Sequence, residues 1–409
     1  MEFVRSSAAM DVNDVDLVPR EQVNGLTSYL DASTVYGSTK EFTEKNLLPN
    51  GKLRVGPNNM LPRSDKMNCK IEDRRRDYCL SAGDHRVNVF VGLGMFHTVF
   101  HREHNRLVDE LARVNPHWRG SKLFQEARKI NAALHQHITY NEYLPSFLND
   151  ATLLTYRLRV GDYRYNPKVD PSVSNAFSTA AFRFGHSQIQ TKVKVGRDEF
   201  KMENTLMRPH LVLTRLDEVV EGLAFTQAEN ADQFFVRAIT DRLFEKDRRK
   251  RDGLDLVSLN TQRGRDHGLA PYNEYRKICG LFPVTSFDSP VFAPGNKLKF
   301  VYEEVVSTVL HRVPMPVLKV LPLGDNTVQK HIDEMSAYYV EESLCKRLKF
   351  KGRQLAEIRD QTLASVMCRN TKVRELQEHM MFVNGTSNPL IPCEDMPKID
   401  FTKWKENPL

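Results

Sequence analysis

The chain has 409 residues, 40% hydrophobic and 27% charged, and its 59 Lys and Arg against 52 Asp and Glu give a formal charge of +7. This composition is typical of globular proteins and excludes a disordered, collagen-like or coiled-coil chain. The longest apolar run, 89–96, is far shorter than the ~20 residues that a membrane-spanning helix needs, so we expect no membrane span. At roughly 150 residues per domain, the length allows two or three domains, or one large one.

The basic residues do not predict a nucleic-acid interface. The densest basic runs, 74–76 and 246–251, are short and are flanked or interrupted by acids. Neither contains the interleaved aromatic side chains on which bases stack. We interpret both runs as solvated loops and expect no nucleic acid as partner.

Oxygen-bearing residues occupy alternate positions near the start of the chain, at Thr27, Tyr29, Asp31 and Ser33. In an extended loop, the two hydroxyls of Thr27 and Ser33 and the carboxylate of Asp31 lie on one side. Calcium binds such oxygen atoms together with backbone carbonyls. Taken alone, however, the pattern is more often an ordinary polar loop.

The segment 93–113 has helical periodicity and carries His97, His101 and His104 at spacings of four and three. Three imidazoles on one helix face suggest a zinc site. The HExxH order of zinc proteases is absent, however, so the segment lacks their general base. The more common explanation is that these histidines are hydrogen-bonded to neighbours on a half-buried helix.

The strongest apolar stripe steps by three and four residues from Leu123 to Ile138 and predicts a helix with Ser121 as its N-cap. The alternation in 192–195 predicts a short strand. Similar helical patterns occur in 175–190, 228–246, 299–310 and 353–367. The chain is therefore predicted to be one mainly α unit with very little β.

Two further segments suggest chemistry. In 181–187, His186 follows Arg183 in an apolar, glycine-interrupted helix. Such a histidine is usually structural, although haem iron takes one imidazole in an apolar pocket, with arginines for its propionates. In 259–268, polar residues are packed between apolar flanks and predict a hydrogen-bonded network. From the residues alone, this network is either a purely structural loop or part of a site.

The six cysteines predict disulfides and an oxidising compartment, because they are even in number and none forms a CxxC pair. They are Cys69, Cys79, Cys279, Cys345, Cys368 and Cys393. The sequon at Asn384 is compatible with secretion. The first residues do not resemble a signal peptide. A chain that begins inside a larger protein would reconcile these two observations.

Taken together, seven segments strongly resemble the animal haem peroxidases. They are LTSYLDASTVYGS (26–38), AGDHR (82–86), HTVFHREHNRL (97–107), FQEARKI (124–130), FRFGH (182–186), SLNTQRGRDHGL (258–269) and LAEIR (355–359). These segments follow the family order, and the resemblance covers most of residues 1–305 and 350–409. It implies a single large helical haem-peroxidase domain over residues 1–409.

The resemblance implies a role for each matching residue. His186 matches the proximal haem ligand, and Asn260 matches the acceptor that orients its second nitrogen. Arg183 and Arg263 match residues near the haem propionates. Arg86 matches the distal arginine, whose charge stabilises the negative charge that develops as the peroxide O–O bond breaks.

The resemblance also implies calcium ligands and disulfides. Thr27, Tyr29 through its carbonyl, Asp31 and Ser33 match the family's calcium residues. The family pattern pairs Cys69 with Cys79 and Cys368 with Cys393. Cys279 and Cys345 then remain as a third pair.

Three departures from the family pattern bear on activity. Nothing in 1–26 resembles the family's distal histidine segment, so proton transfer to the peroxide lacks its usual base and should be slow. Val89 stands where some members carry a glutamate that forms an ester with the haem, so we expect haem b without that link. Residues 306–350 diverge from the family.

Two functions remain open. The favoured hypothesis is a haem peroxidase, cut at an internal methionine, that uses hydrogen peroxide to oxidise phenols or halides. It needs haem b and Ca²⁺, takes a small reducing substrate and belongs to a secreted protein. The alternative is a secreted pseudo-peroxidase that binds a partner or matrix without turnover. A zinc enzyme on the three helical histidines is the least favoured.

Overall fold

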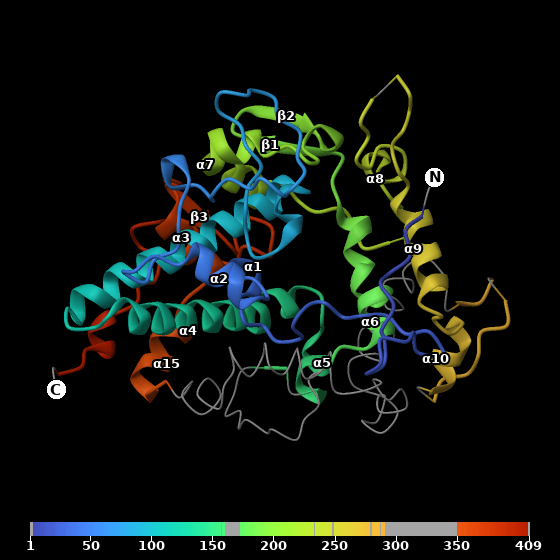
Figure 1. Cartoon of the computed structure of the whole chain (residues 1–409), viewed down its shortest axis with the longest axis horizontal. Helices are drawn as coiled ribbons and strands as arrows, with labels where there is room; N and C mark the ends of the chain where they lie inside the picture. The colour runs from blue at the N-terminus through green and yellow to red at the C-terminus, as the bar shows by residue number, and fades with distance from the viewer. Residues whose placement is uncertain are drawn as a thin grey trace. The chain divides into compact units, whose positions relative to one another are not determined.

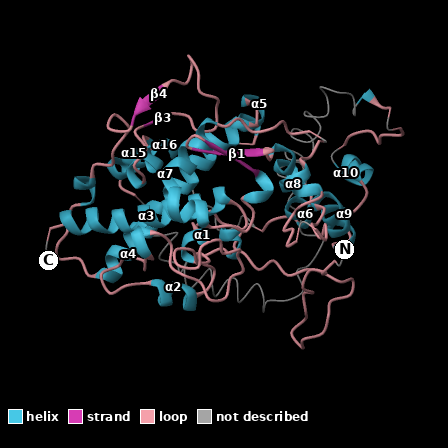
Figure 2. Cartoon of the chain, turned by 90° about the horizontal axis from the view of Figure 1, so that it is seen from above, coloured by secondary structure: helices cyan, strands magenta, loops and turns pink. Residues whose placement is uncertain are grey.

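The computed structural model describes residues 3–156, 158–159, 172–232, 234–247, 249–278, 280–286, 288–290 and 350–407. The chain divides into two compact units, and each is described by itself. The first unit contains 1–28, 147–191 and 228–338, and the second contains 29–146, 192–227 and 339–409. The described elements are mainly helices with two short strand pairs, which confirms the mainly α prediction (Figures 1 and 2). One domain over residues 1–409 stays a prediction.

The second unit contains most of the regular structure. Its helices are α1 (Ser33–Tyr36), α2 (Lys40–Asn46), η1 (Pro57–Asn59), η2 (His85–Asn88), α3 (Val91–Val114), α4 (Gly120–Ile138), η3 (Thr139–Tyr143), η4 (Leu144–Ser146), η6 (Met202–Asn204), α7 (His210–Phe225), α15 (Gly352–Arg359), α16 (Leu363–Asn370) and η10 (Phe401–Trp404). Its strands are β1 (Lys192–Val195), β2 (Asp198–Lys201), β3 (Glu375–Gln377) and β4 (Leu390–Pro392).

The core of the second unit lies where α3 packs against α4, and these are its two longest described helices (Figure 1). Val99 and Leu107 of α3 and Ile130 and Leu134 of α4 are fully buried. Each such side chain contributes roughly 1.5–3 kcal/mol of hydrophobic stabilisation. The predicted helices are confirmed, although α4 starts one residue before Ser121, and its N-cap residue is Arg119.

The predicted strand 192–195 is confirmed as β1, which forms a β-hairpin with β2 through a two-residue loop. Gly196 occupies the turn with a φ of 59°, a left-handed conformation that favours glycine. Val193 and Val195 lie on the same face of β1 and are buried, and β1 packs against α7. Gly222 of α7 allows this approach, because a Cβ atom there would collide with the carbonyl oxygen of Lys194.

A buried carboxylate connects α3 to α16. Glu103 is fully buried and accepts hydrogen bonds from Arg106 at 2.7 and 2.8 Å, from Asn370 at 2.7 Å and from Arg369 at 3.3 Å. Burial raises its pKa, but the guanidiniums of Arg369 and Arg106 outweigh that effect and hold the pKa at about 2. Glu103 is therefore ionised and fully engaged.

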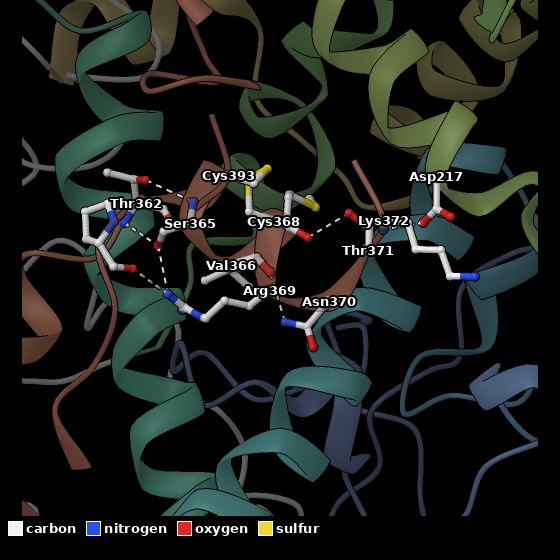
Figure 3. The surroundings of a disulfide bond; sticks show 12 residues. Asp217, Thr362, Ser365, Val366, Cys368, Arg369, Asn370, Thr371, Lys372 and Cys393 are labelled. Atoms are coloured by element: carbon white, nitrogen blue, oxygen red, sulfur yellow. Dashed lines mark hydrogen bonds between the residues drawn. A yellow bond between two sulfur atoms is a disulfide. The ribbon is translucent and has the colours of Figure 1, made fainter. Parts of the chain in front are cut away.

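Two of the expected disulfides are confirmed. Cys69 and Cys79 are bonded with a Cα–Cα distance of 5.5 Å, and Cys368 and Cys393 with 5.3 Å. The second bond joins α16 to the segment after β4 (Figure 3). The suggested pairing of Cys279 with Cys345 lies outside the described residues.

The first unit has shorter elements. They are α5 (Asp150–Thr155), α6 (Asn175–Thr179), η5 (Ala181–Gln188), α8 (Arg237–Thr240), α9 (Leu256–Asp266) and α10 (Tyr272–Ile278). The expected helix 175–190 is interrupted at Ala180, whose ψ of −62° and φ of −128° end α6 before the 3-10 helix η5 begins.

Two other helix predictions were wrong in extent, and one lies outside the described residues. Among the described residues of 228–246 only α8 is helical, and after it Leu243 pairs with Leu254 as a β-bridge, where this pairing overrides local propensity. The segment 353–367 contains two helices, since Thr362 caps the start of α16 by accepting a hydrogen bond from the Ser365 amide. The segment 299–310 lies outside the described residues.

We predict that the buried carboxyl of Glu142, in the π-helix η3, makes the second unit less stable as pH rises. One oxygen accepts a 2.7 Å hydrogen bond from the Leu363 amide, and the other is buried without a hydrogen-bond partner among the described residues. Burial raises the pKa of Glu142 from 4.5 to about 7. The unfolded state therefore loses its proton first, and the free energy of unfolding falls by roughly 3 kcal/mol between pH 4.5 and 7.

Urea unfolding measured at several pH values tests this prediction. Glu142→Gln keeps an oxygen for the Leu363 amide and should remove most of the fall between pH 5 and 8. Glu44→Gln is the control, because the Glu44 side chain is 63% exposed and forms a surface ion pair with Lys40 across one helical turn. Parallel stability curves for the wild-type chain and the Glu142 variant would contradict the prediction.

Candidate functional site

Three of the predicted haem residues meet in the first unit. Asn260 lies in the middle of α9, which begins where the Asp255 side chain caps the amides of Val257 and Ser258. The amide nitrogen of Asn260 is 2.9 Å from His186 Nδ1, and its oxygen accepts a 2.6 Å hydrogen bond from Arg183 Nη1. The polar segment that contains Asn260 is therefore helical over most of its length rather than a loop.

The fourth predicted residue, Arg263, follows one helical turn after Asn260. Its Nη1 donates to the carbonyl oxygen of Val4 at 2.9 Å, to Ser6 Oγ at 3.1 Å and to Asp266 at 3.0 Å. The guanidinium also lies 4.4 Å from the ring centroid of Phe3. Arg263 thus holds the first described residues of the chain against α9.

The electrostatics of this cluster fit a bound anion. Burial, and then the charge of Arg263, lower the pKa of Arg183. Arg183 Nε is also buried without a hydrogen-bond partner among the described residues. Two nearby guanidiniums with a spare buried donor suit the carboxylates of a haem. Burial, and then Arg183, lower the pKa of His186, which favours the neutral imidazole that an iron requires.

Sequence reasoning missed the residue that organises this region. The side chain of Asp266 is only 1% exposed and binds Arg5 Nε at 2.6 Å, the Ser6 amide at 2.8 Å and Arg263 Nη1 at 3.0 Å. Burial alone would raise the pKa of Asp266, but these partners hold it well below its usual range. The sequence signal that could have identified Asp266 is its position next to Arg263 and Arg265, in a polar segment between apolar flanks.

Arg86 lies in the second unit, on η2. The Asp84 side chain caps η2 at the Arg86 amide and binds the Arg86 guanidinium through Nε at 3.0 Å and Nη2 at 2.6 Å. Burial raises the pKa of Asp84, but Arg86 outweighs it and lowers the value to about 2. The Arg86 side chain is 56% exposed, so its charge is oriented yet accessible. Sequence reasoning did not identify Asp84 as its partner.

The boundary between the two units falls within the sequence of the candidate calcium loop. Thr27 belongs to the first unit, whereas Tyr29, Asp31 and Ser33 belong to the second. Within the second unit, Asp31 Oδ1 accepts a 2.9 Å hydrogen bond from the Ser33 amide, and Ala32 between them has a φ of 59°. Burial raises the pKa of Asp31 despite that bond. A carboxylate that is costly to ionise suits a bound cation.

The three helical histidines have separate partners, as the structural explanation predicted. His97 Nδ1 is 2.7 Å from the Leu93 carbonyl oxygen, and His101 Nε2 is 2.9 Å from that of Arg54. His104 is bonded through both nitrogens, to Tyr36 and to Gly51. The part of the chain that the structure describes contains no group of three or more His, Cys, Asp or Glu arranged for a metal. Nor is any of its helices long and apolar enough to cross a bilayer.

Comparison with known proteins identifies the family. The model of the animal haem peroxidase family matches residues 1–310. The chain belongs to this family. It is similar to a peroxidase of Drosophila melanogaster, with 34% identity over 100% of this chain and 64% of the relative. It is also similar to thyroid peroxidase of Rattus norvegicus, with 33% identity over 99% of this chain and 49% of the relative.

A solved structure agrees with this assignment. Peroxidase A from Dictyostelium discoideum aligns with a TM-score of 0.65 and 26% identity, over 95% of this chain and 78% of that one. The family implies haem as cofactor. The chain spans less than two thirds of the Drosophila relative and about half of the thyroid peroxidase.

We predict that Asp266→Asn weakens the first unit, because it removes the charge that faces Arg5 and Arg263. Breaking a buried ion pair from one side costs about 3 kcal/mol. Limited proteolysis should cut residues 3–22 sooner in this variant than in the wild-type chain, and urea unfolding should show the lower stability. The control is Asp241→Asn, which removes an exposed pair with Arg237 and should cost less than about 1 kcal/mol. Equal effects of the two substitutions would contradict the prediction.

Proposed function

We propose that this chain forms the haem-binding part of a peroxidase that uses hydrogen peroxide to oxidise small phenolic or halide substrates. The observation that carries the proposal is the cluster of His186, Asn260 and Arg183 within one unit, in a chain of the animal haem peroxidase family. The residue types and their proximity suit a haem.

Each residue of the cluster has a distinct task. His186 would hold the iron of a bound haem, and Asn260 would set the orientation of its ring. Arg183 and Arg263 would pair with the propionates, for which the buried Nε of Arg183 offers a donor. When bound, haem supplies the redox-active iron of the reaction.

In the second unit, Arg86 supplies a positive charge that Asp84 holds in place. This charge stabilises the negative charge that develops on the peroxide oxygen as the O–O bond breaks. Peroxide cleavage also needs a base that moves a proton, and none of the residues assigned here has that task. We therefore expect slow turnover for this chain alone.

Calcium and secretion belong to the same proposal. Thr27, the Tyr29 carbonyl, Asp31 and Ser33 supply oxygen ligands, and the raised pKa of Asp31 supports a cation beside it. The bonded pairs Cys69–Cys79 and Cys368–Cys393 support an oxidising, extracellular location.

A second candidate function is a pseudo-peroxidase that binds haem and a partner without turnover. None of the residues assigned above supplies the positioned base on which peroxide cleavage depends. Turnover by purified chain loaded with haem separates the two candidates.

We predict that the chain takes up about one equivalent of haem and that His186→Ala abolishes the Soret band of the complex. His117→Ala is the control, since His117 is an exposed residue between α3 and α4. Peroxide-dependent oxidation of a phenolic dye is then measured on the loaded wild-type protein. Haem uptake without oxidation favours the pseudo-peroxidase. If the chain takes up no haem, or the His186 variant keeps the wild-type spectrum, the proposed function is wrong.

We predict that Ca²⁺ stabilises the chain through Asp31. At a concentration one hundred times its Kd, a ligand adds about 2.7 kcal/mol to the free energy of unfolding. The thermal midpoint should therefore rise when Ca²⁺ replaces a chelator, and Asp31→Asn should remove most of the rise. Asp109→Asn is the control, because Asp109 pairs with Lys52 at the surface. A rise of the same size in the Asp31 variant would count against this calcium site.

A further inference from the structure

The Asn260 amide lies between two groups that constrain its direction. Arg183 Nη1 is 2.6 Å from one amide atom, and His186 Nδ1 is 2.9 Å from the other. A guanidinium has only donors, so the atom that faces Arg183 must be the amide oxygen. The amide nitrogen therefore faces His186, and it can only donate.

This direction determines the tautomer of His186. Because Nδ1 accepts a hydrogen bond from Asn260, it carries a lone pair, and the proton of the neutral ring lies on Nε2. An axial ligand needs the opposite arrangement. Its coordinating nitrogen must carry the lone pair, and its other nitrogen must donate to an acceptor. The proton thus occupies the nitrogen that the iron would need.

We propose that Arg183 is a positioning residue that, in the haem-free chain, holds Asn260 in the direction that opposes iron binding, so that haem uptake requires this contact to change. When the Arg183 guanidinium leaves Asn260 Oδ1, the amide turns and its oxygen faces His186. Nε2 then gives its proton to water and Nδ1 takes one from water, so the ring stays neutral and no proton is gained or lost. This inference rests on the proposed haem-binding function.

The surroundings of Arg183 indicate which ligand group releases it. Its Nε is buried without a hydrogen-bond partner among the described residues, and Arg263 lies close enough to lower its pKa. A carboxylate placed between the two guanidiniums satisfies the free Nε and offsets the repulsion between the charges. A haem propionate is such a carboxylate, so its arrival at Arg183 would free Asn260 and prepare His186 for the iron.

The full haem-free chain, labelled with ¹⁵N at histidine, tests the proposal at pH 8, where an ordinary histidine is neutral. Two-bond proton–nitrogen correlations report the tautomer of each ring, and His186→Ala assigns the signal. We expect the Nε2–H form in the wild-type chain. In Asn260→Asp we expect the Nδ1–H form, because a carboxylate accepts from both His186 and Arg183. Arg265→Met is the control, since Arg265 is an exposed residue of the same helix, and it should keep the wild-type tautomer.

Haem uptake, followed by growth of the Soret band after mixing, provides the second measurement. If less than a tenth of the wild-type chain is competent to bind, Asn260→Asp should take up haem at least about tenfold faster. An Nδ1–H ring in the haem-free wild-type chain, or an Asp variant that changes neither tautomer nor rate, overturns the proposal while leaving haem binding intact. If no variant takes up haem although the tautomers are as expected, the proposed function fails instead.

Discussion

The larger of the two units depends on the buried carboxylate of Glu103. A charge removed from water is tolerated only when its hydrogen-bonding capacity is filled, and here Arg106 fills part of it from the same helix. The rest comes from Arg369 and Asn370, which lie 266 and 267 residues away in the sequence. Because these partners belong to α16, the ionised Glu103 requires α16 to pack on α3, and the disulfide Cys368–Cys393 attaches the following strands to the same helix.

The same constraint governs the smaller unit, where Asp266 and Asn260 lie on one helix. Asp266 gathers basic groups around a fully engaged carboxylate and so positions α9 against the start of the chain. The side-chain amide of Asn260 has both a donor and an acceptor, so its orientation follows the neighbour that can only donate. The guanidinium of Arg183 can only donate hydrogen bonds, so the amide oxygen of Asn260 must face it. The amide nitrogen then faces His186 and determines the tautomer of that ring.

Sequence reasoning identified the helices α3 and α4 and the strand β1 because their burial follows one regular period over many turns or one clear alternation. It failed just after α8, where Leu243 pairs with Leu254 as a β-bridge and the predicted helix does not continue. It selected His186, Asn260, Arg183 and Arg263 only through resemblance to a family. It did not select Asp84 or Asp266, since a carboxylate near arginines in sequence is usually a solvated surface pair.

The sequence by itself therefore determined the fold class, the family and the residue types of the haem cluster, because these follow from local periodicity and from motifs in a set order. Tertiary structure alone decided which donor meets which acceptor. Hydrogen-bond direction depends on neighbours distant in the chain, such as Arg183 and Asn260, which are 77 positions apart. The direction of the hydrogen bond from Asn260 determines which nitrogen of His186 carries the lone pair that an iron would bind.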